Sequence, residues 1–525
     1  MTRPNIAQSF EDLETGLTAK TISAFKQHVR SIIEDPHSLE DQKRQGLVDT
    51  AYKALPYTTM SNEAIKAIED GIICLLGEGP TPYHPRYVAP DYQKLLDCGS
   101  DFFDLKPATN LHEAISSLLT VYNYSPTQGS PPFIGALDSL LEPFVANLND
   151  ESARDNLKLF WTLIDRLHPN AFVHGVIGPE ATRTGRLLLD IDNEIQTITN
   201  LTLKYDPQIT PKDYAIQAIR NAMHLSKPYF LNHPYYLDEW GEDYVIASCY
   251  NIMRLKGGIF TLVRLNLSEL ANRFSGTLDE LLNETLPELA ALQMEVINSR
   301  VEHLVEKARW LDHSIFIKEG LLEPEKFTAY AGVVGLNELV NKMMVLMNKP
   351  ECKYGHDQES NNFAVQILDK IKNSLMSHHA VHCLGSDEKI VFHAQVGISE
   401  DQGVTPGCRL PAGTEPDLYT HLRTAATIQP LISGGVSDIF EFDQTAKTNL
   451  DAVKNIIDGA MEMGVRNISI GCVDSEYVRV SGYLIRRVDL ESREEEKLLR
   501  HDTAKIAQEF FNSQPNTIHR RKRFV

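Results

Sequence analysis

Hydrophobic residues recur at helical spacing most clearly between residues 278 and 310. The apolar positions lie three or four residues apart, so one face of a helix would be buried. Pro287 lacks a backbone N–H group, and we expect it to kink or divide this segment. A second helix is predicted over residues 451–463, with Gly464 as its stop signal. The apolar positions of the first segment are Leu281, Leu282, Leu286, Leu289, Leu292, Val296, Val301, Leu304 and Val305.

Short runs rich in β-branched and aromatic residues alternate with the helical segments. The first 120 residues are mainly helical in pattern, with a polar break at 35–38, and residues 124–132 are rich in turn formers and predict a loop. Helices that alternate with short strands predict an α/β fold. The predicted strands are 259–265, 390–394 and 467–470.

Composition narrows the class of protein. Among the 525 residues, 42% are hydrophobic, and no apolar run is long enough for a membrane span. The first twelve residues lack an apolar signal core, so we expect a cytoplasmic protein without a membrane partner. The net charge of -20 argues against a nucleic-acid-binding face. The basic run 519–523 could be a nucleic-acid arm, but pairing with an acidic surface of the same protein is favoured.

Seven cysteines are scattered along the chain without any Cys-x-x-Cys pair. We therefore expect neither a zinc ribbon nor an iron–sulfur cluster bound by this chain. His378, His379, His382 and Cys383 have the side chains of metal ligands at helical spacing. A metal site and a plain helix surface are both consistent with them, and the helix surface is favoured because no second cluster accompanies them.

The pentapeptide Arg479-Val480-Ser481-Gly482-Tyr483 allows two interpretations. It could be a short strand that ends in a glycine turn. It could also be a loop that stores an unpaired electron on the Cα atom of Gly482. Such a radical is stabilised when it is planar and conjugated with both flanking peptide groups. A Cβ atom would crowd that plane, and glycine has none. We favour the radical loop.

A carbon-centred radical of this kind is too stable to attack most substrates, so it must pass its spin to a cysteine. The cysteine should be buried and should keep its proton, because the S–H hydrogen is what moves. Cys249 is the best candidate, since it lies mid-chain in an apolar segment just before Gly257, where a loop tip would suit it. Cys383 and Cys472 are the competing candidates.

Together these residues resemble the glycyl radical enzyme superfamily. The chain is most similar to the YjjI family, nearly from end to end, and leans towards the anaerobic ribonucleotide reductase branch. The pentapeptide matches the superfamily pattern at every position. Three further stretches are the basis of the similarity to the anaerobic ribonucleotide reductase branch, namely 264–271 after Cys249, 332–338, and 405–416.

The resemblance implies a ten-stranded α/β barrel of two half-barrels surrounded by helices, with the Cys249 loop and the Gly482 loop meeting inside. Residues 1–395 would form a helical N-terminal region and the barrel body, and residues 396–525 the C-terminal glycyl radical region. An enclosed site excludes water that would quench the intermediates. The resemblance is also consistent with a homodimer.

The same resemblance implies a modification and a partner. Gly482 would carry an oxygen-sensitive glycyl radical, produced by a separate radical S-adenosylmethionine activating enzyme that holds an iron–sulfur cluster. No cofactor would be bound by this chain. Cys249 would become a thiyl radical and take a hydrogen atom from a small polar substrate. Arg479, Ser481 and Tyr483 would support the radical loop.

Departures from the relatives leave the substrate open. The four-cysteine zinc site that precedes the radical loop in anaerobic ribonucleotide reductases is missing here. Formate acetyltransferases use two adjacent cysteines, and the eliminating dehydratases place a glutamate two residues after the cysteine, where this chain has Asn251. An amide cannot exchange protons as a carboxylate does. Nucleotide chemistry like that of anaerobic ribonucleotide reductases, and a non-catalytic radical-bearing or binding protein, remain the alternatives. The predicted substrate-binding residues are Tyr250, Asn251, Glu415 and Gln128.

Overall fold

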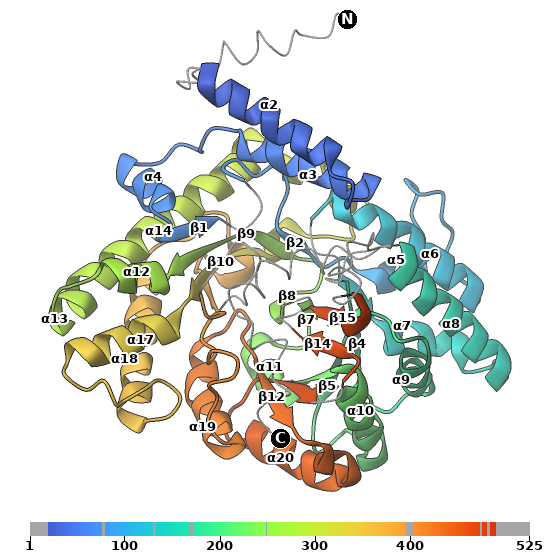
Figure 1. The fold of residues 1–525 in the computed structure, drawn as a ribbon. Helices are drawn as coiled ribbons and strands as arrows, with labels where there is room; N and C mark the ends of the chain where they lie inside the picture. Colours follow the sequence, from blue (N-terminus) through green and yellow to red (C-terminus); the bar gives the residue numbers. More distant parts are fainter. Residues whose placement is uncertain are drawn as a thin grey trace, which may run out of the picture.

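The structure is a computed structural model, and it describes residues 19–75, 79–129, 133–167, 173–247, 249–394, 404–472, 475–479 and 483–489. Strands occupy the centre of the molecule and helices surround them (Figure 1). This arrangement is an α/β fold, as the alternating sequence pattern predicts.

The helices lie mainly on the outside and alternate with the strands along the chain (Figure 1). Their bounds are α2 (Ala19–Glu34), α3 (Glu40–Lys53), α4 (Asn62–Glu69), α5 (Tyr92–Cys98), α6 (Leu111–Tyr124), α7 (Leu137–Val145), α8 (Asp150–Leu167), α9 (Arg183–Ile195), α10 (Lys212–Leu225), α11 (His233–Trp240), α12 (Leu267–Arg273), α13 (Leu278–Glu280), α14 (Leu286–Glu302), α15 (Trp310–His313), α16 (Ile315–Lys318), α17 (Leu336–Leu346), α18 (Gln358–Met376), α19 (Leu418–Ile428) and α20 (Leu450–Glu462).

Most of the strands are short and buried along their whole length. Their bounds are β1 (Ile73–Leu75), β2 (Tyr87–Val88), β3 (Phe133–Ala136), β4 (His174–Ile177), β5 (Asn200–Tyr205), β6 (Tyr229–Asn232), β7 (Tyr244–Ala247), β8 (Asn251–Arg254), β9 (Gly258–Asn266), β10 (Phe327–Val334), β11 (Val391–His393), β12 (Asp438–Phe442), β13 (Asn467–Cys472), β14 (Tyr477–Arg479) and β15 (Leu484–Arg486).

Two mixed sheets form the framework. In the five-stranded sheet, β9, β10 and β11 are parallel, and β1 and β2 pair antiparallel with β9. In the six-stranded sheet the order is β12-β13-β6-β5-β4-β3, and only the β13–β6 pair is antiparallel. Parallel neighbours need a crossover, and helices such as α9 and α10 supply it. Among the described residues, no strand pairing joins the two sheets into a closed barrel.

Two antiparallel hairpins complete the strands. The first pairs β7 with β8, and the second pairs β14 with β15. β7 contacts β4 of the six-stranded sheet and β8 contacts β9 of the five-stranded sheet. The β7–β8 hairpin therefore lies between the two sheets, near the centre of the molecule (Figure 1).

The sequence-predicted elements are found at their expected places. The strands 259–265, 390–394 and 467–470 correspond to β9, β11 and β13, and the helix over 451–463 corresponds to α20. The segment 278–310 is helical but divided. Pro287 is the second residue of α14, which continues without a break from a π-helical turn at Leu281–Thr285, since Thr285 and Leu286 both have right-handed helical backbone angles.

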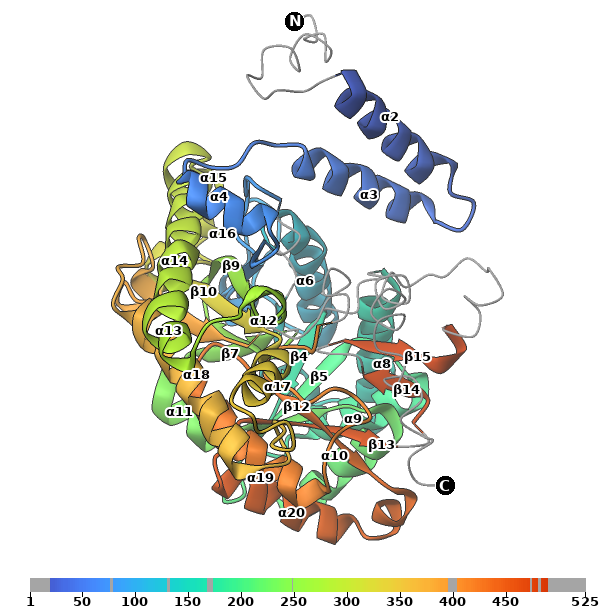
Figure 2. The ribbon, with the colours of Figure 1, turned by 60° about the vertical axis from the view of Figure 1, so that its left-hand side comes forward.

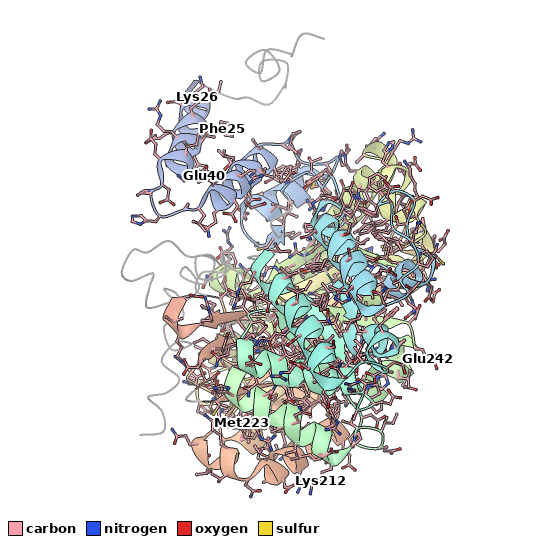
Figure 3. All side chains as sticks on the ribbon, turned by 90° about the vertical axis from the view of Figure 1, so that its right-hand side faces the viewer. Phe25, Lys26, Glu40, Lys212, Met223 and Glu242 are labelled. Atoms are coloured by element: carbon pink, nitrogen blue, oxygen red, sulfur yellow. The ribbon has the colours of Figure 1, made fainter. Side chains whose placement is uncertain are left out.

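The helices α2 and α3 pack on each other and extend from one end of the molecule (Figure 2). Phe25 and Lys26 on α2 and Glu40 on α3 lie well apart from the sheets (Figure 3). At the opposite end, Lys212 of α10 forms an ion pair with Asp451 of α20 at 2.7 Å. None of the described helices is long and apolar enough to cross a membrane.

Candidate functional site

The predicted thiyl residue lies at the tip of the β7–β8 hairpin. Cys249 is buried, and the hairpin register pairs Ala247 with Asn251 on either side of the tip. The Nδ2 atom of Asn251 donates a hydrogen bond to the Ala247 carbonyl at 3.2 Å. Tyr250 adopts a φ of 63°, which a side chain with a Cβ rarely takes and which turns the chain sharply here. The loop-tip position predicted for Cys249 is thus confirmed.

The side chain and carbonyl of Tyr250 hold this tip in place. Its hydroxyl shares a hydrogen bond with Ser469 of β13, and its ring packs edge to face on Tyr229 with centroids 4.5 Å apart. A Cβ atom on Gly435 would collide with the Tyr250 carbonyl, so only glycine allows that close approach. The tip is therefore held by contacts with β6, with β13 and with the segment before β12.

The predicted radical loop lies between β14 and β15 in the sequence, and the register of these strands pairs Arg479 with Leu484. Arg479 is buried, and its guanidinium donates two hydrogen bonds to the Ser226 carbonyl, at 2.7 and 3.1 Å. Its Cζ atom lies 5.8 Å from the centre of the Tyr229 ring. Tyr483 is fully buried. Ser481 and Gly482 lie outside the described residues.

One side chain connects the two candidate segments. Tyr229 on β6 contacts the Arg479 guanidinium on one side and the Tyr250 ring on the other. Its hydroxyl shares a hydrogen bond with Nε2 of His174 at 3.1 Å. Arg479 lies three residues before Gly482, and Tyr250 follows Cys249 directly. The base of the predicted radical loop and the cysteine hairpin are therefore neighbours across a single aromatic ring.

A buried ion pair lies near Arg479. Lys227 is completely buried, and its Nζ atom bonds Asp192 Oδ1 at 2.9 Å, along with the Thr197 and Thr199 carbonyls. Burial lowers the pKa of Lys227, Asp192 opposes that shift, and the nearby Arg479 charge adds to it. Sequence analysis missed this pair. Lysine and aspartate are common surface residues, so neither position carried a signal of burial.

The other two predicted substrate-binding residues lie elsewhere. Gln128 is buried and accepts a hydrogen bond from Ser314 Oγ at 2.8 Å, next to α16. Glu415 lines a pocket of about 830 Å³ beside α19, β12 and α20, and the described lining of that pocket includes no residue of the β7–β8 hairpin. Tyr250 and Asn251 are thus the two members of the set that adjoin Cys249, and the roles of all four stay predictions.

The histidine cluster is not on a helix, which corrects the expected helix surface. The helix α18 ends at Met376, and the residues that follow form turns. Turn geometry separates the side chains, so that His379 lies 3.7 Å from Glu388 and His382 lies 3.1 Å from Glu306. Across the described ranges, no three His, Cys, Asp or Glu side chains are grouped to hold a metal ion.

The two competing candidates for the thiyl residue, Cys383 and Cys472, are also buried. Burial raises the pKa of the Cys383 thiol to about 12.

His393, at the end of β11, is a further titratable group near the hairpin. It is completely buried, and its ring stacks on Tyr330 with centroids 4.8 Å apart. Burial, helped by the charges of Arg86 and Arg264, lowers its pKa to about 3. The sequence did hold a signal, because both His393 and Arg264 interrupt otherwise apolar strands.

We expect His393 to make the protein less stable as the pH falls. Its pKa is about 3 in the folded chain and 6.5 ordinarily, so the unfolded chain takes up the proton first. Below about pH 6.5 the free energy of unfolding should therefore fall by up to about 1.4 kcal/mol per pH unit, levelling off near the folded pKa. Urea unfolding of wild type and His393→Gln at about pH 7 and about pH 5 measures this. Equal losses in both proteins would contradict it.

Comparison with known proteins gives the family. Residues 39–523 match the description "Glycyl radical enzyme YjjI-like". The chain is 37% identical over 472 residues to the uncharacterised protein YjjI of Escherichia coli strain K12, covering 89% of this chain and 91% of that protein. It is 35% identical over 441 residues to an uncharacterised protein of Haemophilus influenzae, covering 83% and 85%.

Solved structures resemble the fold. The anaerobic ribonucleotide reductase from Thermotoga maritima in complex with dATP and CTP aligns with a TM-score of 0.65, at 13% identity, covering 94% of both chains. The same enzyme with glycerol in the active site aligns with a TM-score of 0.63, at 14% identity, covering 94% of this chain and 92% of that one. These likenesses show the fold alone. From the match over nearly its whole length, the chain belongs to the YjjI-like glycyl radical enzyme family.

Proposed function

We propose that this protein is a catalytic glycyl radical enzyme in which Gly482 stores the radical and Cys249 attacks the substrate. Family membership supports the class of reaction. One observation supports the choice of Gly482 and Cys249. Tyr229 contacts both Arg479, at the base of the proposed radical loop, and Tyr250, next to the cysteine. Radical transfer needs the two reacting atoms in near contact, and neighbouring segments in a packed interior can provide it.

The proposed steps move one hydrogen atom at a time. An activating enzyme removes a hydrogen atom from the Gly482 Cα. The resulting carbon radical takes the hydrogen of the Cys249 S–H bond, which restores glycine and leaves a thiyl radical. The thiyl radical then removes a hydrogen atom from a C–H bond of a small polar substrate. After the substrate radical has rearranged, it recovers a hydrogen atom from Cys249, and the spin returns to Gly482.

The finer architecture and the partners belong to the same proposal. Strands of the five-stranded sheet and strands of the six-stranded sheet would form the two half-barrels of a ten-stranded barrel that leaves one of their eleven strands outside it. Residues 1–395 would be the body and residues 396–525 the glycyl radical region. The activating enzyme would be a separate radical S-adenosylmethionine protein with an iron–sulfur cluster. The protein would act in the cytoplasm, where anaerobic metabolism maintains the radical, and it could assemble as a homodimer.

Oxygen should cut the activated chain at Gly482. Dioxygen adds to a Cα radical, and the peroxyl product breaks the backbone at that residue. Anaerobic activation followed by air should therefore release a fragment of about 44 residues, counted from Gly482 to Val525. Mass spectrometry identifies the fragment, and electron paramagnetic resonance before exposure should show a doublet from the single remaining Cα hydrogen.

The matched control is Gly482→Ala, treated in the same way. It should show neither the doublet nor the fragment, because a Cβ atom crowds the planar radical. A wild-type chain that shows no doublet after activation, with the activating enzyme proven competent on another substrate, would refute the radical assignment. Cleavage at a different glycine would refute the choice of residue.

A further inference from the structure

An arginine and a histidine face each other across a bare glycine in the five-stranded sheet. Gly332 on β10 is in register with Arg264 on β9 and with His393 on β11. Residues in register on neighbouring strands project from the same face of a sheet. A Cβ atom on Gly332 would lie 2.9 Å from Arg264 Cγ, so the arginine stem occupies the space above the glycine. The buried side chains of Arg264 and His393 therefore lie on the same face of the sheet, on either side of Gly332.

His393 lies next to the cysteine hairpin. A Cβ atom on Gly435 would lie 3.2 Å from His393 Nε2, and the same atom would collide with the Tyr250 carbonyl. The hairpin and β11 are also joined through backbone hydrogen bonds, from Ile252 N to Gly434 O and from Ala394 N to Gly435 O, each 3.2 Å long. The arginine–histidine row therefore faces the region beside Cys249.

Two buried side chains of this region, His393 and Asn251, have polar atoms without a hydrogen-bond partner among the described residues. His393 is 0% exposed, yet neither ring nitrogen has a hydrogen-bond partner among the described residues. On the cysteine hairpin, Oδ1 of the buried Asn251 also has no hydrogen-bond partner among the described residues. Buried polar groups in proteins nearly always have a hydrogen-bond partner, because leaving one unpaired destabilises the folded state. A bound ligand could supply the missing partner here.

The charges that act on His393 are both positive. Arg264 is fully buried and Arg86 is half-buried, and the two guanidinium groups add to burial in lowering the pKa of the imidazole. No carboxylate is among the groups that shift this pKa. The neutral imidazole donates from one nitrogen, and a guanidinium offers a planar fork of N–H donors that matches a carboxylate or phosphate.

We propose that Arg264 and His393 bind an anionic group, a carboxylate or a phosphoryl group, of the substrate from which Cys249 takes a hydrogen atom. This inference rests on the proposed function for the identity of the reacting cysteine. It narrows the substrate to a small anionic molecule whose reactive C–H bond lies within a few bonds of the charged group. Asn251, on the facing hairpin, is placed to bind a hydroxyl or amino group of the same molecule.

Isothermal titration of the unactivated full chain tests the site without the radical. The probes are acetate and inorganic phosphate, with acetamide as the neutral control. We expect wild type to bind at least one anion in the millimolar range and acetamide more weakly. His393→Gln and Arg264→Gln should each weaken anion binding by about tenfold, because glutamine lacks the charge and the planar fork of the guanidinium and the rigid ring that fixes the direction of the imidazole N–H. Acetate and phosphate compared with each other decide between the two anionic groups.

Arg273→Gln is the matched control, because Arg273 is an exposed arginine paired with Glu269 on α12. It should bind the anions as wild type does. Should Arg264→Gln fail to fold, His393→Gln carries the test, with circular dichroism as the check on folding. Unchanged affinity in a folded His393→Gln, equal binding of acetamide, or no anion binding to wild type would each overturn the proposal. A normal glycyl doublet alongside such a failure would leave the radical assignment intact.

Discussion

The Cys249→Ala variant, activated in deuterium oxide, is expected to keep the doublet of a glycyl radical in its electron paramagnetic resonance spectrum. The doublet of the wild-type protein should change to a single line under the same conditions. The doublet arises from the remaining Cα hydrogen of Gly482. If Cys249 returns its hydrogen atom to Gly482, that atom comes from a thiol that exchanges with solvent, so deuterium gradually replaces the Cα hydrogen. Deuterium couples far more weakly to the electron, and the splitting disappears. Alanine has no transferable S–H hydrogen and blocks the exchange.

This experiment needs no substrate, which makes it the sharpest test of the cysteine. The measurement is the resonance line shape as a function of time after activation. Cys383→Ala is the matched control, because Cys383 is another buried thiol, on the segment after α18. The doublet of this variant should change to a single line as that of the wild-type protein does. Loss of the doublet in Cys249→Ala would assign the thiyl role to another cysteine. Cys472, at the end of β13, would then be tested next.

Replacing Lys227 with methionine is expected to lower the free energy of unfolding by about 3–5 kcal/mol, the cost of leaving one partner of a buried ion pair uncompensated. Both side chains are almost completely buried, at 0% and 1% exposure, so water cannot replace the lost ammonium next to Asp192. The Thr197 and Thr199 carbonyls would lose their donor as well. Urea unfolding of the unactivated chain measures the difference.

The double variant Lys227→Met with Asp192→Leu separates the charge from the packing. Removing both charges should recover a large part of the loss, because no buried ion is left unpaired. Trp161 donates its indole N–H to Asp192 at 2.8 Å, so recovery should stay incomplete. A single variant as stable as wild type would show that the pair is not needed to hold the interior behind Arg479.

Local sequence patterns were sufficient to predict several helices and strands, and they supplied the hypothesis for the chemistry. The apolar spacing predicted the helical segment that contains α14, and Pro287 lies where a π-helical turn passes into α14. The runs that became β9, β11 and β13 stood out by their β-branched residues. The choice of glycine at 482 and of a buried cysteine at 249 follows from what each radical requires of its residue.

The errors and omissions have one cause, which is the distance along the chain between residues that meet in space. The histidine cluster was expected on a helix, but α18 ends at Met376 and turns follow, a boundary that residue spacing alone does not mark. Gln128 and Glu415 lie in other parts of the molecule than the β7–β8 hairpin. Their placement depends on how α16, α19 and α20 pack, and no local pattern encodes that.

The sequence alone therefore supplied the hypothesis that Gly482 and Cys249 carry the radical, because the chemistry of a glycine Cα and of a thiol depends on residue type. Only the tertiary structure decided what surrounds them. Tyr229 joins Arg479 to Tyr250 because β6 passes between the two hairpins. Arg264 and His393 share a face because the strand register sets both opposite Gly332, and a shift of one residue would turn either side chain to the other face.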